Sequence, residues 1–392
     1  MGKPKIRFKG YTDEWEQRKL GEVFKEYSEK NHTELPALTI IQGGGTVKRE
    51  EADRNLMYDE SNLSNYKMVR KDDFIVHLRS FEGGLEKSSL DGIISPAYHT
   101  FHSDVADSRF YYPYFRSHEF IKHKLVPHVY GIRDGRSIDI AGMKTIEIPY
   151  TSMEEQRKIG DYLESLDHLI TLHHRKYEET QKLKKYMLQK MLPQNGRKVP
   201  EIRFSGFTEE WEQRKFSELY ARSSEKNDGS IGMDKNITVA TMQFKNDVKV
   251  SSTEYLKTYY TFNVGDIAFE GHQSKEFRYG RFVENDIGNG IVSHIFAVFR
   301  PIQEYDLYFW KYAINNEALM QRILARSTKA STMMHDLVTN DFLNETFLVP
   351  SVDEQEQIGA FLNKLDRRIT LHQQKCDELR NVKKFMLQNM FI

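Results

Sequence analysis

Basic, amide and hydroxyl side chains gather in short segments that also carry glycine or aromatic residues. Such side chains bind phosphate oxygens and hydrogen-bond the edges of bases. We therefore interpret these segments as candidate nucleic-acid-contacting loops. In the first half of the chain the candidate residues are Lys48, Arg49, Arg79, Ser80, Arg133 and Arg136. In the second half they are Lys245, Lys249, His272, Gln273, Lys275, Arg278, Arg322, Arg326 and Lys329.

Each of these clusters by itself is most often a solvated surface loop, because charged residues are mostly exposed in any protein. Their recurrence at corresponding places in both halves favours the functional interpretation. The charge balance argues against binding through bulk electrostatics, since Lys plus Arg and Asp plus Glu both number 57 and the formal net charge is zero. Any basic surface must therefore be local.

Catalytic motifs are weak by comparison. Gly43–Thr46 lacks the lysine of a phosphate-binding loop, so ATP hydrolysis by this chain is not expected. Ser95–Tyr98 resembles the Asn/Asp-Pro-Pro-Tyr/Phe motif of amino-methyltransferases, but it begins with Ser and lacks the second proline. No glycine-rich turn suited to S-adenosylmethionine accompanies it. We interpret this segment as a buried strand.

Metal-binding patterns are also weak. Asp247 and Lys249 could form half of a metal-dependent nuclease site, but no acidic partner at nuclease spacing precedes them, so a solvated loop is favoured. The histidines of the helical segments have no two carboxylates or cysteines on the same face. Cys376 is the only cysteine, which excludes an internal disulfide and a cysteine-rich zinc site. We predict no catalytic and no metal-binding residues.

Two long segments, residues 152–191 and 351–390, agree at about half of their positions and mark an internal repeat. Each begins with Ser-x-x-Glu, the pattern of a reciprocal capping box. Apolar residues then recur every three and four positions, which is typical of a coiled-coil seam. A helix of roughly 38 residues is about 57 Å long, and alone it would leave its apolar stripe in water. We predict that the two helices pair with each other in antiparallel; the alternative is that each packs only on its own globular neighbour.

A shorter repeat precedes each middle of the chain, because residues 4–22 match residues 200–218. The chain is therefore a tandem duplication with the order leader, middle, helix, repeated once. Aromatic residues of the leaders are predicted to anchor each leader to a helix end: Phe8, Trp15, Phe204 and Trp211. Short β-branched and aromatic runs bounded by turn residues make each middle an α+β domain, with a shared core pattern and divergent loops.

The predicted fold class is thus α+β, with two similar domains separated by a long antiparallel two-helix coiled coil. The predicted boundaries are a leader at 1–22, a first domain at 23–150, a first helix at 151–192, a linker with the second leader at 193–218, a second domain at 219–350 and a second helix at 351–392. The opening residues lack the apolar core of a signal peptide, and no apolar run approaches the roughly 20 residues that span a bilayer. We expect a cytoplasmic protein.

Several features together resemble the specificity subunit of type I restriction-modification enzymes. These are the Glu-Gln-x-x-Ile-Gly start of each long helix just after a proline, the Met-Leu-Gln-x-Met end, Gly265-Asp266-Ile267 and Ile94-Ser95-Pro96. The resemblance covers nearly the whole chain, and it rests on the order of the parts. The sequence departs from the family pattern at Asp72-Asp73, where the family tends to Gly-Asp, and in its neutral net charge.

The resemblance implies that the two middles are target recognition domains, each reading one half of a split double-stranded DNA sequence. It implies that the paired helices fix the gap between the halves and dock two methyltransferase subunits, with two restriction (translocase and nuclease) subunits further out. S-adenosylmethionine, ATP and Mg²⁺ would then act on those partner subunits, and this chain would be non-catalytic without a cofactor. Helices of this length could hold the reading surfaces about 34 Å apart, one turn of DNA.

Two other functions are weighed against this one. A coiled-coil adaptor whose middles bind proteins would tolerate charge reversal at Arg133, Arg136, Arg326 and Lys329 without loss of DNA binding. An enzyme that uses Ser95–Tyr98 would transfer methyl groups as the purified chain alone.

Overall fold

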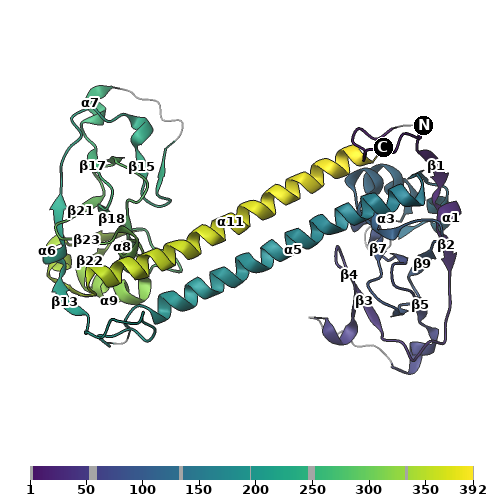
Figure 1. The fold of residues 1–392 in the computed structure, drawn as a ribbon, viewed down its shortest axis with the longest axis horizontal. Helices are drawn as coiled ribbons and strands as arrows, with labels where there is room; N and C mark the ends of the chain where they lie inside the picture. The colour runs from purple at the N-terminus through teal and green to yellow at the C-terminus, as the bar shows by residue number, and fades with distance from the viewer. Residues whose placement is uncertain are drawn as a thin grey trace. The chain divides into compact units, whose positions relative to one another are not determined.

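A computed structural model of the chain describes residues 3–52, 60–131, 136–194, 196–245, 252–331 and 334–391. The chain forms two compact units, of which unit 1 comprises Met1–His174 and Gln374–Ile392, and unit 2 comprises Arg175–Gln373 (Figure 1). Each unit holds one middle of the sequence, one half of its own long helix and part of the other long helix.

Each unit is built around a four-stranded antiparallel sheet. In unit 1 the strand order is β2 (Lys25–Tyr27), β9 (His99–His102), β6 (Phe74–Val76) and β7 (Glu86–Lys87). In unit 2 it is β14 (Tyr220–Ser223), β21 (Ala297–Pro301), β18 (Ile267–Glu270) and β19 (Arg281–Glu284). The two orders correspond strand for strand, as the predicted duplication requires.

Two-stranded antiparallel ribbons surround each sheet. In unit 1 they pair β1 (Glu16–Lys19) with β12 (Glu147–Tyr150), β3 (Leu38–Ile41) with β4 (Gly45–Lys48), β5 (Lys67–Val69) with β8 (Gly92–Ile94), and β10 (Val129–Tyr130) with β11 (Ser137–Ile138). In unit 2 they pair β13 (Glu212–Lys215) with β24 (Thr346–Val349), β15 (Ile237–Thr238) with β16 (Gln243–Phe244), β17 (Tyr260–Phe262) with β20 (Gly290–Val292), and β22 (Thr328–Ala330) with β23 (His335–Leu337). Each leader therefore supplies a strand to its own domain.

Short helices complete the two domains. Those of unit 1 are α1 (Leu20–Val23), α2 (Ser80–Gly83), α3 (Ser108–Phe115), α4 (Ile140–Lys144), the 3₁₀ turns η1 (Arg49–Glu51), η2 (Glu60–Asn65) and η4 (Val126–His128), and the π-helix η3 (Phe120–Leu125). Those of unit 2 are α6 (Phe216–Leu219), the 3₁₀ turn η6 (Met233–Lys235), α7 (Thr253–Leu256), α8 (Leu307–Ile314), α9 (Glu317–Ser327) and α10 (Thr339–Asn344). The predicted α+β class is confirmed.

The sheet of unit 1 separates two apolar layers, because neighbouring side chains of a strand point to opposite faces. Phe74 packs in the larger core with helix α3, whereas Ile75 packs in a smaller cluster with the ribbons. Phe391, which follows the end of the second long helix, completes the larger core by packing on Trp15 and Phe110, with ring centroids 6.4 and 5.0 Å away. In unit 2, the residues that follow the first long helix, Met191 and Leu192, join the corresponding core.

The two long helices are α5 (Met153–Lys190) and α11 (Val352–Met390), close to the predicted bounds. In unit 1, Lys383 of α11 forms an ion pair with Asp167 of α5, and the Cys376 thiol lies 3.6 Å from the Ile170 carbonyl. Residue numbers rise along α5 as they fall along α11, so the helices run antiparallel there. The two helices also meet in unit 2. Packing of each helix only on its own neighbour is therefore wrong.

Glu155, in the first turn of α5, is a buried carboxylate that holds the leader segment. Arg7 binds both of its oxygens, at 2.6 and 2.8 Å, and the Trp15 indole N–H donates to it at 3.0 Å. Burial acts to raise the pKa of Glu155, but hydrogen bonds from Arg7, Thr151 and Trp15 outweigh burial and leave this pKa below its usual value. The glutamate therefore ties the chain start to the long helix.

Unit 2 repeats this anchor. Arg203 binds Glu354 through both oxygens at 2.6 and 2.8 Å, and the Trp211 indole N–H donates to Glu354 at 3.1 Å. The leader phenylalanines also pack on the long helices, with ring centroids 5.7 Å apart for Phe8–Tyr162 and 6.0 Å apart for Phe204–Phe361. The predicted aromatic anchoring of the leaders is confirmed.

The predicted reciprocal capping box forms only in part in the first copy, and the second copy uses a backbone acceptor instead. The Glu155 N–H does donate to the Ser152 hydroxyl at 3.3 Å, but the Glu155 carboxylate faces Arg7 instead of the Ser152 backbone. In the second copy, the Glu354 N–H donates to the backbone carbonyl of Ser351. A guanidinium that engages both carboxylate oxygens is a stronger partner than a single backbone N–H.

The remaining residues of the Glu-Gln-x-x-Ile-Gly motif fasten a short helix to each long one. The Gln156 side chain accepts from the N–H of Asp107, the residue that caps α3, at 2.9 Å. The Gln355 side chain accepts from Asp306, which caps α8, at 3.1 Å. A Cβ on Gly359 would lie 2.1 Å from the Asp306 carboxylate, so α8 can approach this closely only at a glycine. The motif thus marks the place where a short helix, α3 or α8, packs against a long helix.

Ser95–Tyr98 is not the buried strand that we predicted. The segment forms a turn between β8 and β9, in which the Tyr98 N–H donates to the Ser95 carbonyl at 3.1 Å. Pro96 and Ala97 are exposed. Proline and serine favour such a turn, because proline has a fixed φ angle and the Ser95 hydroxyl accepts from the Ala97 N–H.

No helix in the described part of the chain is long and apolar enough to cross a membrane.

Candidate nucleic-acid interface

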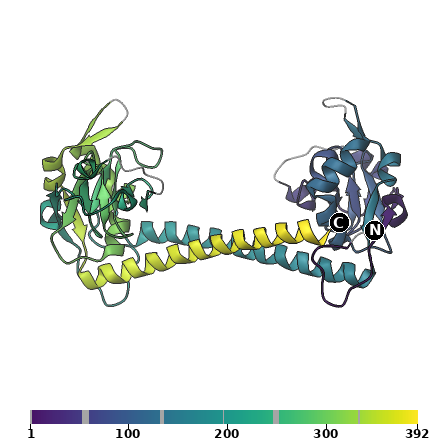
Figure 2. The same ribbon diagram turned by 90° about the horizontal axis from the view of Figure 1, so that it is seen from above.

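A β-hairpin projects from each domain on the face away from the long helices (Figure 2). In unit 1 it is formed by β10 and β11, and in unit 2 by β22 and β23. Each hairpin directly precedes the last short helix of its domain, α4 or α10. Arg136 directly precedes β11 and Lys329 lies in β22, and both side chains are exposed. Arg133 lies outside the described residues.

In unit 1 the hairpin meets the loop that follows β6. The Arg136 guanidinium lies over the Phe81 ring of α2, 5.7 Å from its centroid. Arg79 immediately precedes α2 and its side chain is exposed. The structure therefore brings Arg79 and Arg136, which are far apart in sequence, onto neighbouring loops of one surface.

Unit 2 makes the corresponding junction through its backbone. The His335 N–H of the hairpin donates to the Gly271 carbonyl at 2.8 Å, and His272 forms an isolated bridge with Met334. The exposed side chains of His272, Gln273 and Lys275 therefore lie in a loop that is fixed to the hairpin carrying Lys329.

A third candidate segment in each domain lies at the end of the second strand of one ribbon. Lys48, at the end of β4, is exposed, and its Nζ lies 3.6 Å from Oε1 of Glu51. Arg49 is held by its own domain, because its Nε donates to the Leu38 carbonyl at 3.4 Å. In unit 2 the exposed Lys245 follows β16. Lys249 lies outside the described residues.

Other predicted residues are less available to a ligand. Ser80 is fully buried, and its hydroxyl accepts from the His77 N–H at 2.9 Å, so it closes a turn instead of facing solvent. Arg326 binds both oxygens of Glu345 in a two-pronged ion pair. Arg322 on α9 is exposed, and Arg278 is exposed beside the Tyr279 ring.

Three apolar or aromatic side chains on these loops were missed by the sequence reasoning. Leu78, Tyr130 and Met334 are 61, 59 and 42% exposed and lie next to the predicted cations. Aromatic and apolar side chains contact thymine methyl groups and sugars in DNA-reading loops. Tyr130 could have been found, because it begins the same YGIRDGRS segment that contains Arg136.

The partly buried His77 ring supports the loop that follows β6 in unit 1. Burial, with a smaller contribution from the Arg116 charge, lowers the pKa of His77 to about 4. Its Nδ1 accepts from the Arg79 N–H at 3.3 Å, so the ring orients the backbone beside that cation.

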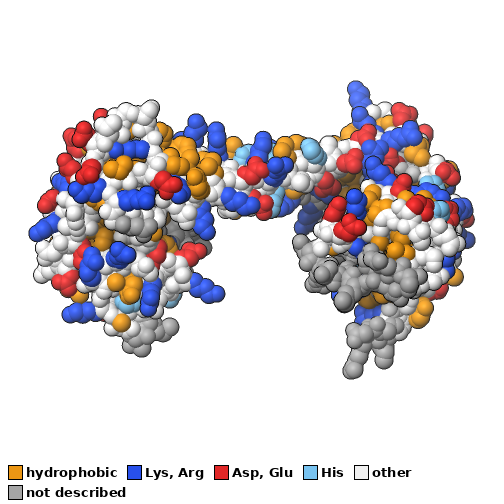
Figure 3. Space-filling model, turned by 90° about the horizontal axis from the view of Figure 1, so that it is seen from below, with side chains coloured by type: hydrophobic (Ala, Val, Ile, Leu, Met, Phe, Trp, Pro, Cys, Tyr) orange, Lys and Arg blue, Asp and Glu red, His pale blue; other side chains and the backbone are white. Residues whose placement is uncertain are grey.

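Charge on the face drawn in Figure 3 is mixed on both units, with Lys and Arg side chains interspersed among Asp and Glu. In the described part of the chain, no group of three or more His, Cys, Asp or Glu residues could hold a metal ion. The loops combine guanidinium, ammonium, amide and aromatic groups, which are the kinds of group that bind phosphates and read base edges in DNA-binding proteins.

Comparisons with known proteins identify the family of the chain. The family described as type I restriction modification DNA specificity domain matches residues 12–182 and again residues 208–381. No curated protein matches the chain.

Solved structures are similar over almost the whole chain. A type I restriction-modification S subunit from M. genitalium has a TM-score of 0.58 and 14% identity, covering 100% of this chain and 99% of that one, and this likeness shows the fold. The HsdS subunit from Thermoanaerobacter tengcongensis has a TM-score of 0.46 and 18% sequence identity, and the match covers 96% of both chains. A structure described as the basis of complex assembly and conformational transition of the type I R-M system has a TM-score of 0.44 and 16% sequence identity. The match covers 96% of this chain and 97% of that one. Because the family matches both halves, this chain belongs to the type I restriction-modification DNA specificity family.

Proposed function

We propose that each domain of this specificity subunit reads one half of a bipartite DNA target and that the paired long helices set the gap between the halves. One observation carries this proposal. The anchors and the sheet repeat between the units, whereas the loops that hold exposed cations differ in sequence and backbone contacts. A duplicated scaffold with divergent loops is suited to two sites that bind the same kind of ligand with different specificities.

The long helices are suited to a spacer. Both are continuous over almost their whole predicted length, and in each unit they are held by ion pairs such as Lys383–Asp167 and Lys184–Asp366. A continuous helix transmits a fixed rise of about 1.5 Å per residue. Its length therefore sets a defined number of base pairs.

The same helices also offer a surface for partner subunits. Large apolar side chains are exposed at matching positions of the two copies, namely Leu172 and Leu371, Leu183 and Val382, and Tyr186 and Phe385. Exposed apolar side chains that recur in a pattern mark protein contacts. We assign them to methyltransferase subunits, one on each copy, with restriction subunits bound further out. S-adenosylmethionine, ATP and Mg²⁺ would act on those partners, and this chain would supply no catalytic group.

The spacer is tested by inserting one heptad into both helices, after His174 and after Gln373. Seven residues add about 10 Å and nearly preserve the side-chain face, so the tolerated gap should lengthen by about three base pairs. Methylome sequencing of cells that express the variant with methyltransferase subunits reports both half-sequences and the gap. Unchanged half-sequences with a longer gap support the proposal, and an unchanged gap or altered half-sequences contradict it.

The partner surface has its own test. Tyr186→Glu together with Phe385→Glu should abolish co-purification with methyltransferase subunits, because a charge replaces an apolar contact in each copy. Lys9→Glu, an exposed change in the leader, serves as the control. Retained co-purification of the double variant contradicts this assignment.

A further inference from the structure

The turn that joins β3 to β4 presents an exposed amide that the candidate loops described above do not include. The turn comprises residues 42–44, and all three are exposed. The Gly44 N–H donates to the Ile41 carbonyl at 2.8 Å, which closes the turn tightly. Gln42 and Gly43 occupy its two central positions, and Gly43 has a φ of +83°, which glycine adopts without steric cost. Gln42 therefore stands at the tip of a turn of defined conformation.

Glu86, on the edge strand β7, fixes this turn from inside the domain. Its carboxylate is fully buried and accepts from the N–H groups of Gly43 and Gly45, at 2.7 and 3.3 Å. The Arg116 guanidinium binds the same carboxylate, and the Tyr112 hydroxyl donates to it at 2.8 Å. A carboxylate with this many partners holds the backbone that follows the tip in one arrangement.

The tip residue lies against α2, the short helix that connects two of the predicted cations. A Cβ on Gly83 of α2 would lie 2.1 Å from Nε2 of Gln42, so the glutamine side chain crosses the helix where a glycine leaves room. Arg79 directly precedes α2, and the Arg136 guanidinium lies over the Phe81 ring of α2. Gln42 therefore belongs to the same surface as Arg79 and Arg136.

The Gln42 amide is available to a ligand. It is exposed, and its side chain has no hydrogen-bond partner among the described residues. It can therefore use both its N–H donors and its carbonyl acceptor. A glutamine amide accepts from the N6 amino group of adenine and donates to N7, and adenine presents these two groups side by side in the major groove.

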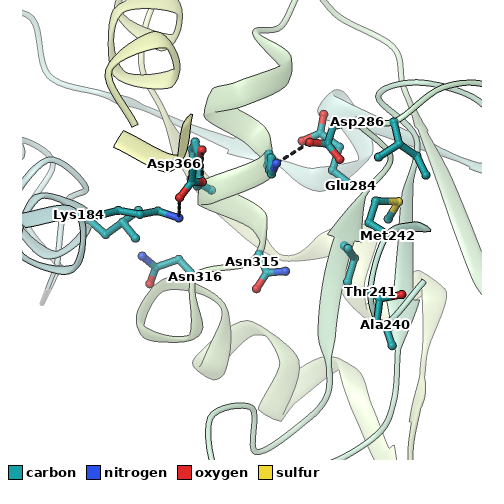
Figure 4. A pocket seen from close by; sticks show the side chains of 14 residues that line it. Lys184, Ala240, Thr241, Met242, Glu284, Asp286, Asn315, Asn316 and Asp366 are labelled. Atoms are coloured by element: carbon teal, nitrogen blue, oxygen red, sulfur yellow. Dashed lines mark hydrogen bonds and ion pairs between the residues drawn. The ribbon is translucent and has the colours of Figure 1, made fainter. Parts of the chain in front are cut away.

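Unit 2 builds the corresponding turn from different residues. Residues 239–242 join β15 to β16, and Figure 4 shows Ala240, Thr241 and Met242 on this turn. Ala240 and Thr241 are exposed. The exposed part of the second turn thus offers methyl and hydroxyl groups, whereas the tip of the first offers an amide.

The support beneath the turn also differs in unit 2. Val283 takes the register position on β19 that Glu86 takes on β7. Asn315 directly follows α8 as Arg116 directly follows α3, and both helices have eight residues. Unit 2 therefore lacks both members of the Glu86–Arg116 pair. A pocket of about 510 Å³, lined by Val283 and Asn315, opens beside its turn (Figure 4).

Arg281 of β19 holds the second turn instead. Its guanidinium donates to the Ala240 carbonyl at 2.7 Å and is itself paired with Glu270 at 2.7 Å. In unit 1 a carboxylate accepts from backbone N–H groups of the turn, and in unit 2 a guanidinium donates to a backbone carbonyl of the turn. The edge strand thus anchors the turn in both domains, while the exposed side chains have changed. An element that helps to set specificity is expected to vary in this way.

We propose that Gln42 is a specificity-determining residue of the first domain, and that its amide reads the adenine of an A·T pair in the half-sequence that this domain contacts. The inference rests on the proposed function, in which each domain reads one half of the target. Glu86 acts as a positioning residue, because it holds the turn without reaching the surface itself.

Methylome sequencing of cells that express the chain with methyltransferase subunits tests this role. Gln42→Ala should lower the discrimination between bases at one A·T position by about tenfold or more, because a bidentate base contact is lost. The rest of that half-sequence, the other half and the gap should not change. Gln17→Ala removes an exposed amide from β1 of the same domain and is the matched control, for which the target should be unchanged.

Two further variants sharpen the test. Gln42→Arg places at the tip a side chain that binds O6 and N7 of guanine, so the same position should shift from A·T towards G·C. Glu86→Gln weakens the hold on the turn and should relax the same position as Gln42→Ala. A purely structural role of Glu86 would instead lower methylation at all sites alike.

The outcomes separate this inference from the proposed function. The inference is overturned if Gln42→Ala leaves the target unchanged, if it relaxes a position other than an A·T pair, or if it lowers methylation at all sites alike. If Arg136→Ala changes one half-sequence while Gln42→Ala changes none, the inference fails and the proposed function stands. If single changes in the first domain alter both half-sequences, the proposed function itself fails.

Discussion

The two domains differ most where a buried glutamate meets the helix that covers the sheet. In unit 1, Glu86 is saturated by Arg116, Tyr112 and the glycine-rich turn. In unit 2, Glu284 is equally buried but has no partner among the described residues, and a pocket lies beside it. The anchors of the two leaders on the long helices, by contrast, are the same in both copies. Divergence has therefore reached inside the domains, beyond their surface loops.

This contrast separates two kinds of buried charge. A saturated carboxylate stabilises one backbone arrangement, because each of its acceptors is already used. An unpaired carboxylate leaves an unfavourable term that protonation reduces. The first domain thus carries its own fixed support beneath the β3–β4 turn, whereas in the second domain the corresponding position of the edge strand is the apolar Val283.

The largest effect is expected at the shared anchors. Arg7→Met and Arg203→Met each leave a buried carboxylate without its guanidinium, and each should lower the free energy of unfolding of its unit by about 3–5 kcal/mol. Chemical denaturation followed by circular dichroism measures this. Lys9→Met, an exposed change, should have no effect. A large loss in one copy with none in the other would show that the anchors are not equivalent.

A smaller but asymmetric effect is expected after α3 and α8. Arg116→Met removes the cation that binds Glu86 and should cost about 2 kcal/mol of unfolding free energy, since the pair is partly exposed. Asn315→Met faces an open pocket and should change stability by no more than about 0.5 kcal/mol. The same denaturation experiment decides this, and equal costs would erase the distinction drawn between the two domains.

The reading surfaces should respond separately. Arg136→Ala should affect the reading of one half-sequence, and Lys329→Ala the reading of the other. A residue that contacts a base should lose about 1–2 kcal/mol of discrimination between bases, and one that contacts a phosphate should lose a similar amount of affinity for every sequence. Methylome sequencing with each variant identifies the affected half. If either change altered both halves, the assignment of one half-sequence to each domain would have to be abandoned.

The smallest effect concerns pH. The pKa of Glu284 is raised in the folded state, so this state keeps a proton that the unfolded chain releases above about pH 4.5. The contribution of this group to the free energy of unfolding should therefore fall as the pH rises from that value, by at most about 1.4 kcal/mol per pH unit. Glu284→Gln should flatten this slope in thermal melts across pH, while Glu356→Gln, an exposed change on α11, should retain it. A slope that is the same in wild type and Glu284→Gln would be incompatible with a protonated Glu284.

The sequence predicts the repeated elements well because their signals are local. Helical periodicity and the recurring Glu-Gln-x-x-Ile-Gly motif locate α5 and α11 almost to the residue. The partner of Glu155 could not be predicted in this way, because Arg7 lies 148 positions away and a nearby serine offered a plausible alternative. Long-range ion pairs leave no periodic trace in a single sequence.

The candidate site was predicted only in part. Exposed cations such as Arg136 and Lys329 could be proposed from residue type and from their recurrence in the two halves. The Ser80 hydroxyl is buried in a turn, and the assignment of Ser80 to DNA contact stays a prediction. The pocket of unit 2 was not foreseen, because it depends on a change of partner between β19 and the end of α8.

The way the core of unit 1 is completed bears on the order in which the protein can fold during synthesis. Unit 2 is one uninterrupted stretch, so all of its residues can leave the ribosome before the second segment of unit 1 has done so. Unit 1 needs Phe391 against Trp15 and Phe110, which were made hundreds of residues earlier. Part of its apolar surface stays open to water until Phe391 has been made. Loss of a few C-terminal residues should therefore expose the first-made half of the polypeptide to proteolysis and aggregation, and spare the later-made half.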